Sequence, residues 1–119
     1  MLTFGGHRIY LAAGVTDMRK SFNTLAGIVR DRLDADPMSR HLFLFCNRHR
    51  NRLKVLVADE SGMWVLNKRL DRGTFAWPAI HDDVVRIEYR EEQLALLLQG
   101  FDADALKPRR WRRRSSSAR

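Results

Sequence analysis

The first forty residues contain two different patterns of apolar residues. Residues 8–13 (RIYLAA) form a short apolar stretch that ends at Gly14, a pattern that predicts a β-strand. Behind it, Met18, Phe22, Leu25, Ala26, Val29 and Leu33 recur at intervals of three or four, which predicts an amphipathic helix. Thr16 or Asp17 is placed to cap the start of this helix, and Pro37 prevents its continuation.

The pattern changes at Leu42. Residues 41–46 (HLFLFC) are almost continuously apolar, residues 47–51 (NRHRN) are polar, and residues 52–58 (RLKVLVA) alternate. Polar turns then lead into residues 63–70 (MWVLNKRL) and residues 74–77 (TFAW). Three or four consecutive strands with short connections are typical of an antiparallel meander.

The last periodic segments are residues 84–89 (VVRIEY), a further predicted strand, and residues 91–100 (EEQLALLLQG), a predicted short helix that stops at Gly100. The order of elements predicts an α+β fold, in which an antiparallel β-meander sheet carries an N-terminal amphipathic helix and a short C-terminal helix on one face. We expect residues 1–106 to form a single domain, and residues 107–119 to be a basic, disordered tail.

Composition agrees with a globular domain, since 45% of the 119 residues are hydrophobic and 30% are charged. A single cysteine, Cys46, excludes an internal disulfide and fits a reducing compartment. The N-terminus lacks the features of a signal peptide, and no apolar run approaches the roughly 20 residues that span a bilayer. We therefore expect a cytoplasmic protein with no membrane partner.

Positive charge is concentrated in two segments, the predicted hairpin at residues 48–54 and the C-terminal residues 107–119. The net charge is +8, and residues 107–119 contain seven Lys and Arg residues and no acid. Such clusters attract polyanions, and an aromatic side chain among arginines can stack on a base. The alternative is a solvated, charge-protected sheet edge and a solubilising tail. The candidate nucleic-acid-binding residues are Arg48, Arg50, Arg52, Lys54, Lys68 and Arg69 in the body, and Arg109, Arg110, Trp111, Arg112, Arg113 and Arg114 in the tail.

The sequence gives little support for a catalytic site or a metal site. The acids fall at predicted turns and helix starts, the four histidines lack metal-ligand spacing, and no glycine-rich loop matches a phosphate cradle. We expect no cofactor, no metal and no enzymatic activity. A metal-dependent nuclease that uses Asp17, Asp36, Asp59 or Asp71 is the minor alternative. Trp77 is interpreted as a core anchor rather than a partner contact.

Four segments in the same order carry a family resemblance: residues 16–22 (TDMRKSF), 36–56 (DPMSRHLFLFCNRHRNRLKVL), 68–78 (KRLDRGTFAWP) and 93–102 (QLALLLQGFD). Together they resemble the small accessory protein encoded by the second open reading frame of insertion sequences of the sixty-six family. This TnpB-type protein is unrelated to the RNA-guided nuclease of the same name. The matching positions include Asp17, Met18, Arg19, Lys20, Trp77 and Pro78. Arg40 departs from the pattern, since a glycine is usual there, and so does FDADAL at 101–106, where Ile-Asp-Trp is usual.

The resemblance implies a role in transposition, beside a transposase and another accessory protein of the same element. No catalytic residue is assigned in this family, so none is transferred. We expect a non-catalytic accessory factor that binds DNA by backbone contacts through a basic hairpin and tail; the alternative is an adaptor for the transposase without direct DNA contact. The preference between DNA and RNA, the target sequence and the oligomeric state stay open. Residues 48, 50, 52 and 54 share one side only if the hairpin loop keeps the alternation of the strand.

Overall fold

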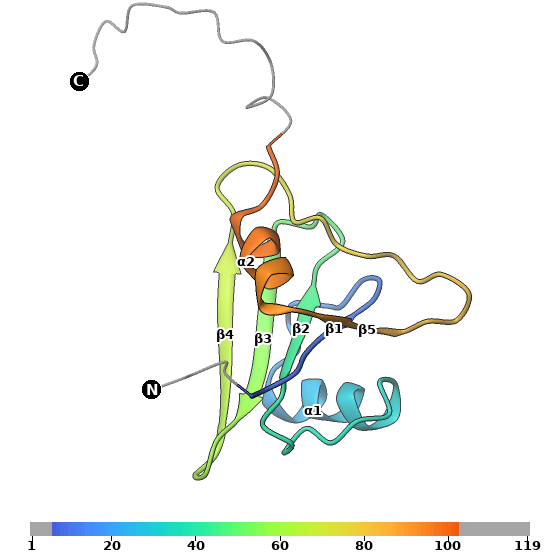
Figure 1. The fold of residues 1–119 in the computed structure, drawn as a ribbon, viewed down its shortest axis with the longest axis vertical. Helices are drawn as coiled ribbons and strands as arrows, with labels where there is room; N and C mark the ends of the chain where they lie inside the picture. Colours follow the sequence, from blue (N-terminus) through green and yellow to red (C-terminus); the bar gives the residue numbers. More distant parts are fainter. Residues whose placement is uncertain (1–5, 103–119) are drawn as a thin grey trace, which may run out of the picture.

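The computed structural model describes residues 6–102. Within this range five strands form one sheet in the order β4-β3-β2-β1-β5, and two helices pack on it (Figure 1). The strands are β1 (Ile9–Ala12), β2 (Leu42–Cys46), β3 (Arg52–Ala58), β4 (Met63–Arg69) and β5 (Arg86–Tyr89), and the helices are α1 (Phe22–Asp31) and α2 (Glu91–Gln99). The predicted α+β class is confirmed. The expected tail at residues 107–119 lies outside the described residues.

The sheet is mixed, which corrects the expectation of a purely antiparallel meander. β1 pairs with β2 in parallel, with Ile9 opposite Leu42, while β2–β3, β3–β4 and β1–β5 are antiparallel. Parallel neighbours require a crossover connection, and the segment between β1 and β2 supplies one because it contains α1. The first helix therefore follows β1 and is not strictly N-terminal.

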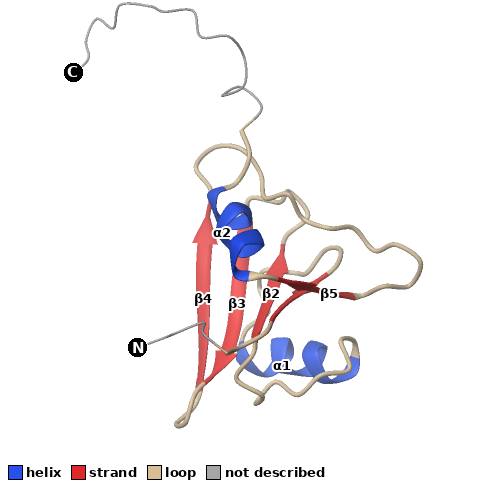
Figure 2. Ribbon diagram, in the orientation of Figure 1, coloured by secondary structure: helices blue, strands red, loops and turns tan. Residues whose placement is uncertain are grey.

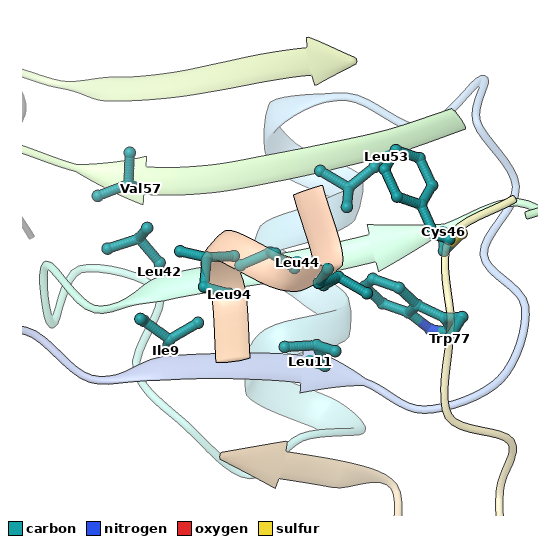
Figure 3. Packing of buried hydrophobic residues seen from close by; sticks show 11 residues of the cluster. Ile9, Leu11, Leu42, Leu44, Cys46, Leu53, Val57, Trp77 and Leu94 are labelled. Carbon is teal, nitrogen blue, oxygen red and sulfur yellow. The ribbon is translucent and has the colours of Figure 1, made fainter. Parts of the chain in front are cut away.

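The two helices cover opposite faces of the sheet, and not one face as predicted (Figure 2). Leu25, Val29 and the other buried residues of α1 pack with Phe43 and Phe45 of β2. Leu94 and Leu97 of α2 pack with Leu42 and Leu44 of the same strand, together with other residues of that cluster (Figure 3). All five residues of β2 are buried, because this central strand is covered on both sides.

The first helix begins later than predicted. The residue at its N-cap is Ser21, without a side-chain hydrogen bond; Asp17 begins the turn that precedes it, and Thr16 lies before that turn. The second helix agrees with its prediction: Glu91 and Glu92 occupy the first turn, and Gly100 ends the helix with a positive φ of 74°.

Residues 74–77 do not form the fourth meander strand. They run as an extended connection from which Phe75 and Trp77 enter the core, and their one ladder contact is the bridge between Thr74 and Phe101. Gly73 makes this bridge possible, because a Cβ at that position would collide with the Phe101 carbonyl. The chain then crosses to the far edge of the sheet, where β5 pairs with β1.

Candidate nucleic-acid interface

The loop between β2 and β3 is held from inside by one asparagine. The side-chain Oδ1 of Asn47 accepts hydrogen bonds from the backbone N–H groups of Asn51 and Arg52, both at 3.0 Å, and its Nδ2 donates to Asn51 Oδ1 at 2.8 Å. Arg50 has a positive φ of 59°, and its carbonyl accepts the backbone N–H of Phe75 at 2.7 Å. The backbone of this loop is thereby fixed, while the side chains of Arg48 and Arg50 stay exposed.

This loop separates the predicted hairpin bases into two groups. Arg48 and Arg50 line a cavity of about 230 Å³ together with Trp77 and Pro78. Arg52 and Lys54 belong to β3, and Lys54 lies opposite Phe45, whose side chain packs on the α1 side of the sheet. The tight turn at residues 47–51 breaks the strand alternation, so these four bases do not form one continuous row.

Arg52 has an unusual cross-strand neighbour. It lies directly opposite Arg69 of β4, so the two guanidinium-bearing side chains leave the same face of the sheet. A groove of about 520 Å³ opens at this place. We call it the basic groove; it is lined by Met18, Arg52, Leu53, Lys54, Asn67, Lys68 and Arg69.

Acids do little to neutralise the basic groove. Arg69 has a carboxylate partner in Asp71, at 3.8 Å, but both side chains are largely exposed. Among residues 6–102, neither Arg52 nor Lys54 has a carboxylate within 4.0 Å. The groove therefore retains positive charge that an anion can balance.

The turn that precedes α1 forms one wall of the groove. The Asp17 carboxylate accepts the backbone N–H of Arg19 at 2.9 Å and binds its guanidinium in a bidentate manner, which holds the pKa of Asp17 well below its usual range. The Lys20 carbonyl accepts a hydrogen bond from Lys54 Nζ at 2.6 Å, and Met18 lines the groove. Arg19 is consequently engaged by Asp17, whereas Lys54 is held by a neutral carbonyl and has no carboxylate within 4.0 Å among residues 6–102.

Lys68 has a different role. It lies opposite Leu53, whose side chain packs under α2, and its Nζ donates to the Leu98 carbonyl in the last turn of that helix at 2.6 Å. The C-terminal end of a helix favours a cation, so this contact ties β4 to α2.

Trp77 and Pro78 connect the long crossing segment to the end of β1. The Trp77 side chain belongs to the buried cluster drawn in Figure 3. It is 7% exposed, and its indole N–H donates to the Ala12 carbonyl at 2.9 Å. The Pro78 carbonyl accepts the backbone N–H of Gly14 at 2.9 Å. The interpretation of Trp77 as a core anchor is confirmed.

The aspartates considered for the nuclease alternative make hydrogen bonds or ion pairs with neighbouring residues. Asp36 accepts the backbone N–H of Met38, and Asp59 accepts the N–H groups of Ser61 and Gly62 and the indole N–H of Trp64. These hydrogen bonds lower the pKa of Asp59 to about 2. In the described part of the chain, His, Cys, Asp and Glu residues form no group of three that could hold a metal ion.

Cys46 is fully buried, and burial raises the pKa of its thiol to about 11, so it is poorly suited to act as a nucleophile. No helix within residues 6–102 has the length and apolar character needed to cross a membrane. The tail candidates Arg109, Arg110, Trp111, Arg112, Arg113 and Arg114 lie outside the described residues.

Sequence reasoning missed two features. Met18 and Asn67 line the basic groove, although neither was a binding candidate. On the opposite face, Trp64 and Leu66 of β4 are 49% and 38% exposed. The alternation of residues 64, 66 and 68 in MWVLNKR could have indicated this apolar row.

Comparison with known proteins supplies the family. The model of the IS66 Orf2-like proteins matches residues 7–108. Two proteins of Sinorhizobium fredii (strain NBRC 101917 / NGR234) are similar to the chain, and both are described as uncharacterized. The protein y4hO is 40% identical over 95 residues, 80% of this chain and 81% of its own length. The protein y4jC is 32% identical over 102 residues, 86% of each chain.

No solved structure matches the chain significantly. The family match covers most of the sequence, including the turn at residues 17–20, the hairpin and the Trp77 anchor. The chain therefore belongs to the family of IS66 Orf2-like proteins, accessory proteins of insertion-sequence transposition.

Proposed function

We propose that this accessory protein acts without catalysis, by binding the DNA backbone through the basic groove. The observation that carries the proposal is the placement of Arg52 directly opposite Arg69, with Lys54 two residues further along β3. Like charges at directly opposed positions of a sheet are unfavourable, and a phosphate between them would remove that repulsion. The basic tail at residues 107–119 adds further phosphate contacts.

The contacts are of the kind that fixes position without reading sequence. Arg52, Lys54 and Arg69 are long cationic side chains at a sheet surface, and no residue of α1 or α2 lines the groove beside them. Affinity then depends on counterion release. About six engaged phosphates would give a log-log slope of affinity against salt of roughly −5.

Fluorescence anisotropy of a labelled duplex at several salt concentrations tests the proposal. The double variant Arg52→Ala, Arg69→Ala should reduce the slope by about 2, because two phosphate contacts are lost. The double variant Arg8→Ala, Arg30→Ala makes the same charge change away from the groove and serves as the matched control. Deletion of residues 107–119 should reduce the slope by several units.

Three results would contradict the proposal: no binding at low salt, binding without salt dependence, or equal losses in the groove variant and its control. An RNA duplex of the same length and sequence, titrated in parallel, distinguishes RNA from DNA as the preferred partner.

A second candidate function is that of an adaptor for the transposase, and one observation favours it. An apolar groove of about 210 Å³ lies between α2 and strands β3 and β4, lined mainly by leucine and valine side chains, among them Leu66 and Leu98. The transposase should then copurify with the protein after nuclease digestion, and the variant Leu98→Ser should weaken the pair. Separation of the two proteins upon DNA digestion would exclude direct docking.

A further inference from the structure

Strand β4 ends the sheet on one side, and its outer edge is unpaired by any strand of residues 6–102 (Figure 1). Hydrogen bonds at both ends of the β3–β4 ladder define which peptide groups face outward. Asp59 N donates to Gly62 O at 2.8 Å, and Leu70 N donates to Asn51 O at 2.8 Å. In an antiparallel ladder bonded pairs alternate, so residues 64, 66, 68 and 70 bond to β3. The peptide groups of residues 63, 65, 67 and 69 therefore point away from the sheet.

This edge has few of the features that usually prevent strand addition. β4 has seven residues, contains no proline, and keeps one uninterrupted register with β3 from Met63 to Arg69. Its charges are Lys68 and Arg69, both at one end. The acids Asp59 and Glu60 lie in the turn just before the other end.

We propose that β4 pairs antiparallel with β4 of a second copy of this chain, centred on Leu66. Leu66 is the midpoint of Met63–Arg69, so this register pairs all seven residues, whereas a shift in either direction pairs fewer. In this register, residues whose peptide groups point outward lie opposite each other. Val65 of each copy exchanges two hydrogen bonds with Asn67 of the other copy. The arrangement has twofold symmetry, as most protein dimers do.

Charge and side-chain contacts favour the same register. The basic end of each strand comes to lie beside the acidic turn of the other copy, since Arg69 faces Met63 and the acids precede Met63 by a few residues. On the α2 side, Leu66 meets Leu66 of the second copy, and Trp64 lies opposite the aliphatic stem of its Lys68. The exposed apolar row of Trp64 and Leu66 is thereby covered.

Of the three bases in the proposed DNA contact, Arg52 and Lys54 lie on β3 and take no part in the pairing, whereas Arg69 lies on β4 and pairs with Met63 of the second copy through its backbone. The pairing would place two basic grooves in one particle. A single pair of seven-residue strands buries less than a standard interface, so we expect a dissociation constant in the micromolar range, on the order of 10–100 µM.

Sedimentation velocity of the nuclease-treated full chain, over a range bracketing that constant, tests the proposal. A concentration-dependent monomer–dimer equilibrium is expected. Asn67→Pro removes an outward N–H without removing a bond to β3, and should shift the equilibrium at least tenfold toward monomer. Asn67→Ala keeps the N–H and should behave as the unmodified chain. A monomer at every concentration, or a dimer unaffected by Asn67→Pro, would overturn the proposal.

A crosslinking experiment tests the register without proline. Leu66 faces its own copy as a non-hydrogen-bonded pair, where Cα atoms lie about 4.5 Å apart, within the range of a disulfide. The variant Leu66→Cys should therefore form a covalent dimer rapidly under mild oxidation. Leu96→Cys, at a 68% exposed position of α2, is the matched control. If Leu66→Cys crosslinks no faster than Leu96→Cys, the edge does not pair with a second copy in this register.

Discussion

Arg52 and Arg69 face each other across the β3–β4 ladder, and the pair has opposite consequences for stability and for binding. The free protein carries the repulsion of two like charges, whereas a bound phosphate would turn the same pair into a chelating site. The first prediction separates these two effects.

Arg52→Thr should raise the free energy of unfolding by about 0.2–1 kcal/mol, because the cross-strand repulsion is removed and threonine favours a strand. The same change should reduce the salt slope of DNA binding by about 1. Urea unfolding and anisotropy titration measure the two quantities. A variant that loses stability and affinity together would show that Arg52 is a structural residue.

Several elements of the fold were predictable because their signal is local. The spacing of Leu25, Ala26 and Val29 predicts an amphipathic helix, and the alternation of residues 52–58 predicts a strand, as observed. The parallel pairing of β1 with β2 is not local. It depends on the crossover through α1, whereas a meander joins consecutive strands only by short antiparallel connections.

The continuously apolar strand at residues 42–46 also indicates where the helices lie. A strand that is apolar at every position is covered on both faces, and β2 is indeed buried by α1 on one side and α2 on the other. That reasoning would have placed the helices on opposite faces.

Charge density along the sequence indicates the bases of β3 but does not indicate how they are arranged. The opposition of Arg52 and Arg69 follows from the β3–β4 register, and the separation of Arg48 and Arg50 follows from the loop held by Asn47. Both depend on backbone geometry that composition does not reveal.

Arg40 occupies a position where the family resemblance predicts glycine, and its φ of 71° lies in the left-handed region. A side chain at this conformation costs about 1 kcal/mol or more, partly offset by the lower flexibility of a non-glycine residue in the unfolded chain. Arg40→Gly should therefore raise the free energy of unfolding by about 0.5–1 kcal/mol. Arg40→Ala removes the same charge but keeps the strain, and should give no comparable gain in urea unfolding. Equal gains in stability for Arg40→Gly and Arg40→Ala would show that the lost charge, and not the backbone strain, is the cause.

Trp77 joins the crossing segment to β1 through its indole N–H and the Ala12 carbonyl. Trp77→Phe removes this bond and part of a buried side chain, and should lower the free energy of unfolding by about 2–3 kcal/mol. Trp64→Phe is the matched control, because Trp64 is about half exposed and donates to the exposed carboxylate of Asp59. Its cost should stay below about 1 kcal/mol. Similar costs for both changes would contradict the anchoring role of Trp77.

Asp59 organises the β3–β4 turn by accepting hydrogen bonds from Trp64, Ser61 and Gly62, and these bonds lower its pKa from 3.8 to about 2. Since the folded pKa lies below the unfolded one, its contribution to stability is present above about pH 4 and is lost as the pH falls toward 2. The unfolding free energy of Asp59→Asn should thus depend less on pH in this window than that of the unmodified chain. Urea midpoints between pH 5 and pH 2.5 measure the difference. Glu60→Gln makes the same charge change one residue away and should keep the full pH dependence of the unfolding free energy. If Glu60→Gln reduces this pH dependence as much as Asp59→Asn does, the hydrogen bonds of Asp59 are not the source of the pH dependence.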